Sequence, residues 1–103
     1  MHGKKLGLLL SARPEAANFR HGLRLAEAAL RQGVDVYLYC IDDAVHGLAD
    51  TELQTLKVRG LKLYPCAYGA HRRNIPLREQ AAFAGLTLVS DLVAGTDRFL
   101  SFN

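Results

Sequence analysis

The residue in this sequence that is best placed to do chemistry is Cys66. It follows the short apolar segment 61–65 and opens what is predicted to be a helical turn. Three basic residues come within the next two turns: His71, Arg72 and Arg73. Backbone N–H groups at the start of a helical turn, together with nearby cations, favour a thiolate over a thiol. A thiolate is the form of cysteine that attacks sulfur or carries it, so we expect Cys66 to be the reactive residue.

The alternative for Cys66 is a packing role, because free cysteine is among the most buried residue types. The other cysteine, Cys40, lies inside the apolar segment 36–41 and is expected to pack. Cys40 is a candidate resolving partner for Cys66 only if the ends of their two strands adjoin. Two cysteines are too few for the disulfide framework of a small secreted protein, which favours a reducing, cytoplasmic setting.

The sequence lacks the motifs that mark metal, nucleotide and hydrolase sites. The spacings from Cys66 to His71 and from Cys40 to His46 match no compact zinc pattern. The turn at 11–14, after the first predicted strand, has neither a Gly-rich dinucleotide fingerprint nor a P-loop, and the chain has no Gly-x-Ser-x-Gly elbow. We therefore expect no metal and no cofactor. A domain that binds a small molecule or nucleotide at the same sheet edge stays open as an alternative.

The composition indicates one ordinary globular domain over residues 1–103. Half of the residues are hydrophobic and 22% are charged, a balance that excludes disorder. The net charge of +3 comes without a run of five like charges, so we expect no nucleic-acid partner. No apolar run approaches the ~18 residues that a membrane span needs, so we expect no membrane partner. Lys4 and Lys5 before the apolar run 6–12 faintly resemble a signal peptide, but the same residues serve as a first buried strand.

Strand-like and helix-like segments alternate along the chain. Short apolar runs predict strands at 6–10, 34–41, 61–64, 86–90 and 98–102. Apolar periodicity and end signals predict helices at 14–32, 51–58 and 77–84, with a loop at 44–50 and one helical turn within 91–95. This alternation predicts an α/β fold, a three-layer α/β/α sandwich around a mostly parallel five-stranded sheet. Reactive groups gather beyond the carboxyl ends of such strands, which is where Cys66 is expected.

Four segments, spread along nearly the whole chain, carry a resemblance to known proteins. They are the opening 5–11, the end of the first helix with 33–36, the cysteine segment 61–75 and the closing 97–102. Together they resemble the DsrE/DsrF-like sulfur-relay family, which includes TusD-like subunits. The resemblance implies a cytoplasmic sulfur carrier, similar to a sulfurtransferase, that holds sulfane sulfur as a persulfide on Cys66 and passes it to an acceptor protein. It also implies sulfur-donor and sulfur-acceptor proteins as partners, and assembly as a homo- or hetero-oligomer.

The resemblance leaves a second interpretation open, because several members of the family lack the cysteine and act as structural subunits. The chain would then be a non-catalytic, oligomer-forming interaction subunit in which Cys66 packs. In the first interpretation His71, Arg72 and Arg73 stabilise the thiolate and the persulfide anion. In the second they form a solvated basic face.

Overall fold

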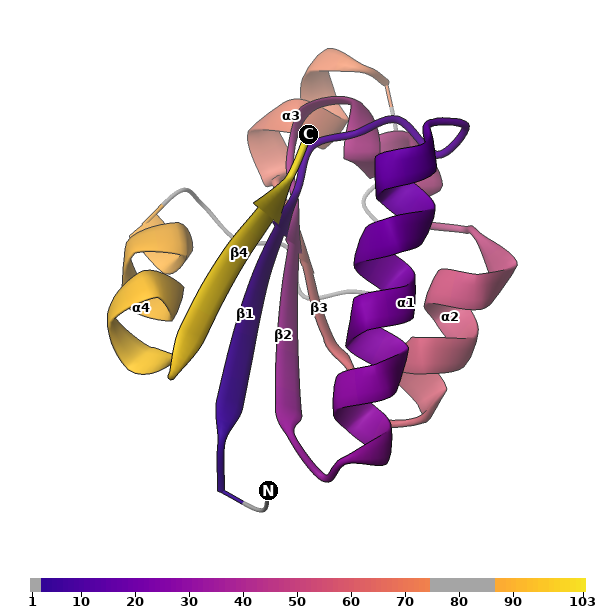
Figure 1. The fold of residues 1–103 in the computed structure, drawn as a ribbon. Helices are drawn as coiled ribbons and strands as arrows, with labels where there is room; N and C mark the ends of the chain where they lie inside the picture. Colours follow the sequence, from indigo (N-terminus) through magenta and orange to yellow (C-terminus); the bar gives the residue numbers. More distant parts are fainter. Residues whose placement is uncertain (1–2, 75–86) are drawn as a thin grey trace.

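Four parallel strands form the sheet on which the rest of the chain packs (Figure 1). The computed structural model describes residues 3–74 and 87–103. The strands are β1 (Lys5–Leu10), β2 (Asp35–Cys40), β3 (Lys62–Pro65) and β4 (Arg98–Phe102), in the order β3-β2-β1-β4. The helices are α1 (Ala17–Arg31), the 3-10 helix η1 (Asp42–Gly47), α2 (Thr51–Val58), α3 (Ala67–Arg72) and α4 (Thr87–Gly95).

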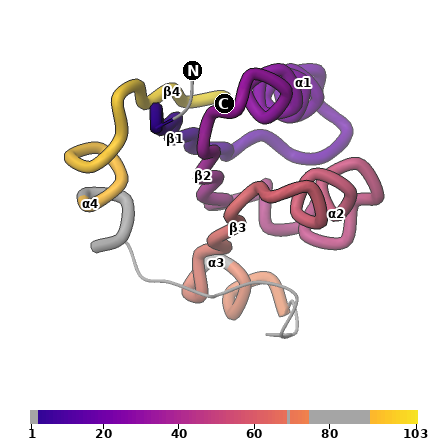
Figure 2. Tube along the Cα trace, turned by 90° about the horizontal axis from the view of Figure 1, so that it is seen from below, coloured from indigo at the N-terminus to yellow at the C-terminus, as the bar shows by residue number. Residues whose placement is uncertain are grey.

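The main hydrophobic core lies between the sheet and the helices α1 and α2. Figure 2 shows both helices on the same side of the strands, with α4 on the other side. Leu8 and Leu10 of β1 and Leu38 of β2 are fully buried in this core, where they pack with Phe19 of α1 and Leu53 of α2. Alternate residues of a strand point to opposite faces of a sheet. The residues between these leucines therefore point toward the α4 face.

A second, smaller cluster occupies the α4 face of the sheet. Its buried members are Tyr39, Cys66 and Leu92, and partly buried hydrophobic side chains pack against them: Leu9, Tyr37, Ile41, Tyr64 and Phe99. Leu92 comes from α4, and Tyr39 comes from β2, at the centre of the sheet. This cluster therefore joins Cys66, the residue that follows β3, with residues of β2 and α4.

The start of β4 is joined to the start of β1 by a reciprocal pair of hydrogen bonds. The backbone N–H of Lys5 donates to Asp97 Oδ2 at 2.7 Å, and the backbone N–H of Asp97 donates to the carbonyl oxygen of Lys5 at 2.8 Å. From this point β4 runs parallel to β1, with Leu6 opposite Arg98 and Leu10 opposite Phe102. The pair therefore sets the register of the edge strand.

The predicted α/β fold with a parallel sheet is confirmed. The predicted helix 51–58 and the predicted strand 98–102 agree with α2 and β4 at both ends. The segment predicted as the loop 44–50 begins within the 3-10 helix η1. Among residues 3–74 and 87–103, no helix combines the length and the apolarity that crossing a membrane requires.

The prediction of five strands is wrong, because the described residues form a sheet of four. The segment predicted as the strand 86–90 contributes residues 87–90 to α4. Periodicity alone cannot distinguish a short apolar run in a strand from one in a buried helix. The helix predicted at 77–84 lies outside the described residues. The three-layer arrangement stays a prediction. In the part of the chain that the structure describes, α4 lies on the second side of the sheet, and one helix does not amount to a complete layer.

Gly7 of β1 lets the ring of Phe99 lie close against the sheet on the α4 face. A Cβ atom at position 7 would stand 2.6 Å from Phe99 Cδ2, too close for the ring to keep its place. We expect Gly7→Ala to lower the free energy of unfolding by about 1–3 kcal/mol, the usual cost of overpacking. Urea unfolding followed by circular dichroism measures this loss.

The matched control for Gly7→Ala is Gly95→Ala, at the end of α4. A Cβ atom at position 95 meets nothing within 4 Å, so this change should leave stability the same or raise it slightly. Equal stability of the two variants would contradict the close approach of Phe99 to Gly7.

Candidate functional site

Cys66 lies directly after β3 and directly before α3, at the carboxyl edge of the sheet (Figure 1). Its backbone N–H donates to the carbonyl oxygen of Cys40 at 2.8 Å, and its own carbonyl oxygen accepts from the N–H of Ala70 at 3.0 Å. The first bond continues the pairing of β2 with β3, and the second belongs to the first turn of α3. The backbone of Cys66 is therefore held from both sides, in the position that the sequence predicts.

The thiol of Cys66 is buried, with 3% of the residue exposed. It packs with Tyr39 of β2 and Leu92 of α4. Tyr39 is hydrogen-bonded to Cys66 through its side chain. Burial and, to a smaller extent, this hydrogen bond raise the pKa of the Tyr39 hydroxyl above its ordinary value. The Tyr39 hydroxyl therefore keeps its proton and acts as a hydrogen-bond donor to the sulfur.

Cys40 lies on the opposite face of the sheet from Cys66. It is fully buried in the main core, among side chains of α1, α2, β1 and β2. Tyr39 and Cys40 are neighbours on one strand, so their side chains point to opposite faces. The ends of β2 and β3 do adjoin, since Cys40 is the register partner of Pro65. The two thiols nevertheless face away from each other, and this excludes Cys40 as a resolving partner in this fold.

The three basic residues predicted to support Cys66 follow it on and after α3. His71 and Arg72 are exposed, and the guanidinium of Arg72 lies 5.8 Å from the centre of the Tyr68 ring. Arg73 is half-buried, and its Nη2 atom is 3.3 Å from Asp43 Oδ1 of η1. Their support of the Cys66 sulfur stays a prediction.

Sequence reasoning missed Tyr39, although a signal for it was present. In the segment 37–40 two tyrosines alternate with Leu38 and Cys40. If the strand is placed beside the one that leads to Cys66, this alternation puts Tyr37, Tyr39 and Cys66 on one face. The strand prediction for 34–41 rests on its apolar, β-branched and aromatic content alone, which assigns no face to its members.

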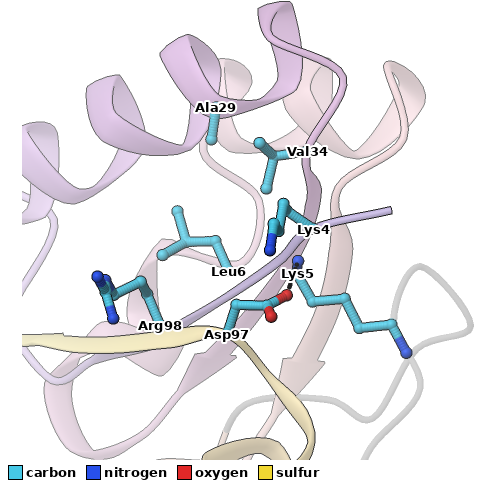
Figure 3. Close-up of a pocket in the computed structure, with 7 residues that line it drawn as sticks. All are labelled: Lys4, Lys5, Leu6, Ala29, Val34, Asp97 and Arg98. Atoms are coloured by element: carbon cyan, nitrogen blue, oxygen red, sulfur yellow. Dashed lines mark hydrogen bonds between the residues drawn. The ribbon is translucent and has the colours of Figure 1, made fainter. Parts of the chain in front are cut away.

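A pocket of about 380 Å³ lies at the other edge of the sheet, where β1 and β4 begin (Figure 3). Leu6, Ala29 and Val34 give it an apolar wall, and Lys4 and Arg98 also line it. This pocket is distant from the carboxyl edge at which a ligand of such a sheet is expected. In the part of the chain that the structure describes, no three His, Cys, Asp or Glu side chains gather as a metal site requires.

Two comparisons with known proteins match almost the whole chain. The model of the DsrE/DsrF-like family matches residues 4–102. The crystal structure of the YchN protein from E. coli superposes with a TM-score of 0.80 at 20% sequence identity, covering 99% of this chain and 100% of that one. At this identity the superposition shows a shared fold. None of the curated proteins compared with the chain matches it in sequence.

The burial of Cys40 makes the free energy of unfolding depend on pH in the alkaline range. Burial raises the pKa of the Cys40 thiol from 9.0 to about 12. Between these two values the unfolded chain has released the proton and the folded chain still holds it. The unfolded state then binds fewer protons, so the free energy of unfolding falls as pH rises, by up to ~1.4 kcal/mol per pH unit for this group. The contribution is complete below pH 9 and is lost toward pH 12.

Replacing Cys40 by Ala should therefore flatten the decline of stability between pH 8.5 and pH 10.5, a range chosen to bracket the onset at about 9. Urea unfolding at several pH values in this range measures the slope for both proteins. The comparison uses slopes because Cys40→Ala also leaves a small cavity, which lowers stability at every pH. Parallel slopes would show that the folded state does not hold the Cys40 proton.

Proposed function

Since this chain belongs to the DsrE/DsrF-like family, we propose that it is a sulfur carrier that holds sulfane sulfur as a persulfide on Cys66. The observation that carries the proposal is the placement of this sulfur. Cys66 is held at the carboxyl edge of the sheet by its backbone hydrogen bond to Cys40, and its thiol accepts a hydrogen bond from a buried tyrosine. A cysteine that only fills space needs no such donor.

The proposed reaction consists of two transfers of one sulfur atom. In the first, the Cys66 thiolate attacks the outer sulfur of a donor persulfide. A new S–S bond forms on Cys66, the S–S bond of the donor breaks, and the donor leaves with the electron pair as a thiolate. In the second, an acceptor thiolate attacks the outer sulfur on Cys66, and the electron pair returns to the Cys66 sulfur. Each transfer exchanges one S–S bond for another, so neither needs an oxidant or a reductant.

The burial of the thiol means that a sulfur donor has to gain access to it. Leu92 of α4 belongs to the same buried cluster as Cys66, so α4 is the element whose displacement we expect to expose the sulfur. We therefore include a local opening of the packing around Leu92 in the proposal. His71, Arg72 and Arg73 are exposed or half-buried on the neighbouring α3 side, where they would stabilise the persulfide anion once the site is open.

The partners that we propose are a sulfur-donor protein, a sulfur-acceptor protein and further copies or relatives of this chain. Tyr68 and Val93 support a role for contacts beside the site, because both are large hydrophobic side chains with more than half of their surface exposed. Tyr68 belongs to α3 and Val93 to α4, the two elements that flank Cys66. Both cysteines are free thiols, which suits a cytoplasmic protein.

A second candidate function is a non-catalytic interaction subunit of the same family. The burial of Cys66 in an apolar cluster favours it, because buried structural cysteines are inert. The two functions differ in one measurable property. A carrier accepts a sulfur atom on Cys66 in the folded state, whereas a packing cysteine does not.

The test of the carrier function is to incubate the folded protein with a low-molecular-weight persulfide and measure its intact mass. We expect the wild-type protein to gain one sulfur atom and to lose it again when an excess of a small thiol is added as acceptor. Cys66→Ser should gain none, because its hydroxyl cannot form the S–S bond.

Cys40→Ala is the matched control, since it removes the other thiol and leaves Cys66 and Tyr39 in place. It should gain the sulfur atom as the wild-type protein does. If the wild-type protein gains no sulfur while remaining folded, the second candidate function is favoured, and if Cys66→Ser gains as much as the wild type, Cys66 is not the carrier residue.

A further inference from the structure

The sulfur of Cys66 lies in surroundings that oppose a negative charge. Tyr39, Leu92 and the side chains packed against them are aromatic or aliphatic. Across residues 3–74 and 87–103 the buried set contains no charged side chain that would offset a thiolate. An unpaired anion in such surroundings is strongly disfavoured, so a thiolate there depends on a hydrogen-bond donor.

Tyr39 supplies this donor from the neighbouring strand. It is fully buried, and its hydroxyl is hydrogen-bonded to Cys66. The backbone bond from Cys66 to Cys40 holds the sulfur beside β2, so the contact follows from the pairing of the two strands. Because the pKa of the Tyr39 hydroxyl is raised, it keeps its proton when the thiol loses its own. The hydroxyl therefore still has a proton to donate when the thiol has become a thiolate.

Most of the charged groups on the surrounding elements lie at the surface. Asp42 and Asp43 of η1, Arg72 of α3 and Asp91 of α4 are exposed, as is His71. Arg73 is half-buried and forms an ion pair with Asp43. Exposed charges are screened by water, so they act on the buried sulfur less than a direct hydrogen bond does.

We propose that Tyr39 is a catalytic residue of the sulfur-transfer site, which stabilises the Cys66 thiolate in both transfers through its hydroxyl. This inference rests on the proposed sulfur-carrier function. In the first transfer the thiolate is the attacking group. In the second it is the leaving group, because the electron pair of the broken S–S bond returns to the same sulfur atom. One donor on this atom therefore assists the loading and the unloading of sulfur alike.

The experiment compares the rate at which iodoacetamide alkylates Cys66 in Tyr39→Phe and in the otherwise unchanged protein, across a range of pH. Both carry Cys40→Ala, so that Cys66 is the thiol that reacts. The substitution removes the hydroxyl and keeps the ring. A hydrogen bond to a charged group contributes about 1.5–3 kcal/mol, so we expect the alkylation rate near neutral pH to fall about tenfold or more. The midpoint of the rate–pH profile should move up by about one pH unit or more.

The midpoint of the profile separates hydrogen bonding from access. A looser packing around position 39 would admit water to the sulfur, which favours the thiolate, so it would move the midpoint down and raise the plateau at high pH. The loss of a donor to the thiolate moves the midpoint up.

Tyr37→Phe is the matched control. Tyr37 lies on the same strand and face, two residues before Tyr39, and its hydroxyl is 3.5 Å from Lys62 Nζ. Removing this hydroxyl should leave the midpoint of Cys66 alkylation unchanged. A midpoint that is the same in Tyr39→Phe, Tyr37→Phe and the parent protein would overturn the role of Tyr39.

A second measurement covers the case in which Tyr39→Phe does not fold. In the parent protein all tyrosines are replaced by 3-fluorotyrosine, whose more acidic hydroxyl is a stronger donor. The midpoint of Cys66 alkylation should then move down, and an unchanged midpoint would overturn the role of Tyr39.

The two proposals fail in different ways. A shifted midpoint in a protein that gains no sulfur from the persulfide leaves the hydrogen bond in place and overturns the carrier function. A protein that gains sulfur normally, with an unchanged midpoint in Tyr39→Phe, overturns the role of Tyr39 and leaves the carrier function in place.

Discussion

The placement of the candidate site depends on one backbone hydrogen bond, from the N–H of Cys66 to the carbonyl oxygen of Cys40. It extends the pairing of β2 with β3 one residue beyond the last register pair, Cys40 with Pro65. Because side chains alternate along a strand, it also decides which face of the sheet receives the thiol. Cys66 joins Tyr39 on the α4 face, and Cys40 joins the main core on the other. A shift of one residue in this pairing would separate Cys66 from Tyr39.

Much of the fold could be predicted from the sequence, because its strands and helices have clear ends. Asp50 caps α2 by accepting a hydrogen bond from the N–H of Leu53, and the predicted and observed helices agree. The strand predicted at 86–90 is wrong, and the number of residues that follow it already argues against a strand there. Residues 91–97 are too few to connect it to a parallel neighbour at 98–102, since such a crossover takes a dozen residues or more. A helix ending near Asp97 brings the chain to the start of β4 without that difficulty.

The candidate site could be predicted only in part, and the reason is again geometric. The position of Cys66 follows from local sequence, since it comes directly after a strand and before a helical turn. Its contacts come from β2 and α4, whose residues lie more than twenty positions away in the sequence. Sequence spacing drew attention to His71, Arg72 and Arg73, which are near Cys66 along the chain. The contacts described for Arg72 and Arg73 are with Tyr68 and Asp43, whereas Tyr39, which spacing did not indicate, is hydrogen-bonded to Cys66.

The two cysteines show how one sheet can give the same residue type two different roles. Both follow apolar strand residues and both are buried, and a backbone hydrogen bond joins one to the other. Cys40 faces a core of aliphatic and aromatic side chains, where burial raises the pKa of its thiol to about 12 and keeps it neutral. Cys66 faces a hydroxyl that cannot readily lose its proton and therefore donates to sulfur. Burial alone makes a thiol inert. Burial beside a fixed hydrogen-bond donor also excludes water, but the donor stabilises the negative charge of the thiolate that sulfur transfer requires. The face of the sheet on which each cysteine lies thus separates the packing residue from the candidate reactive one.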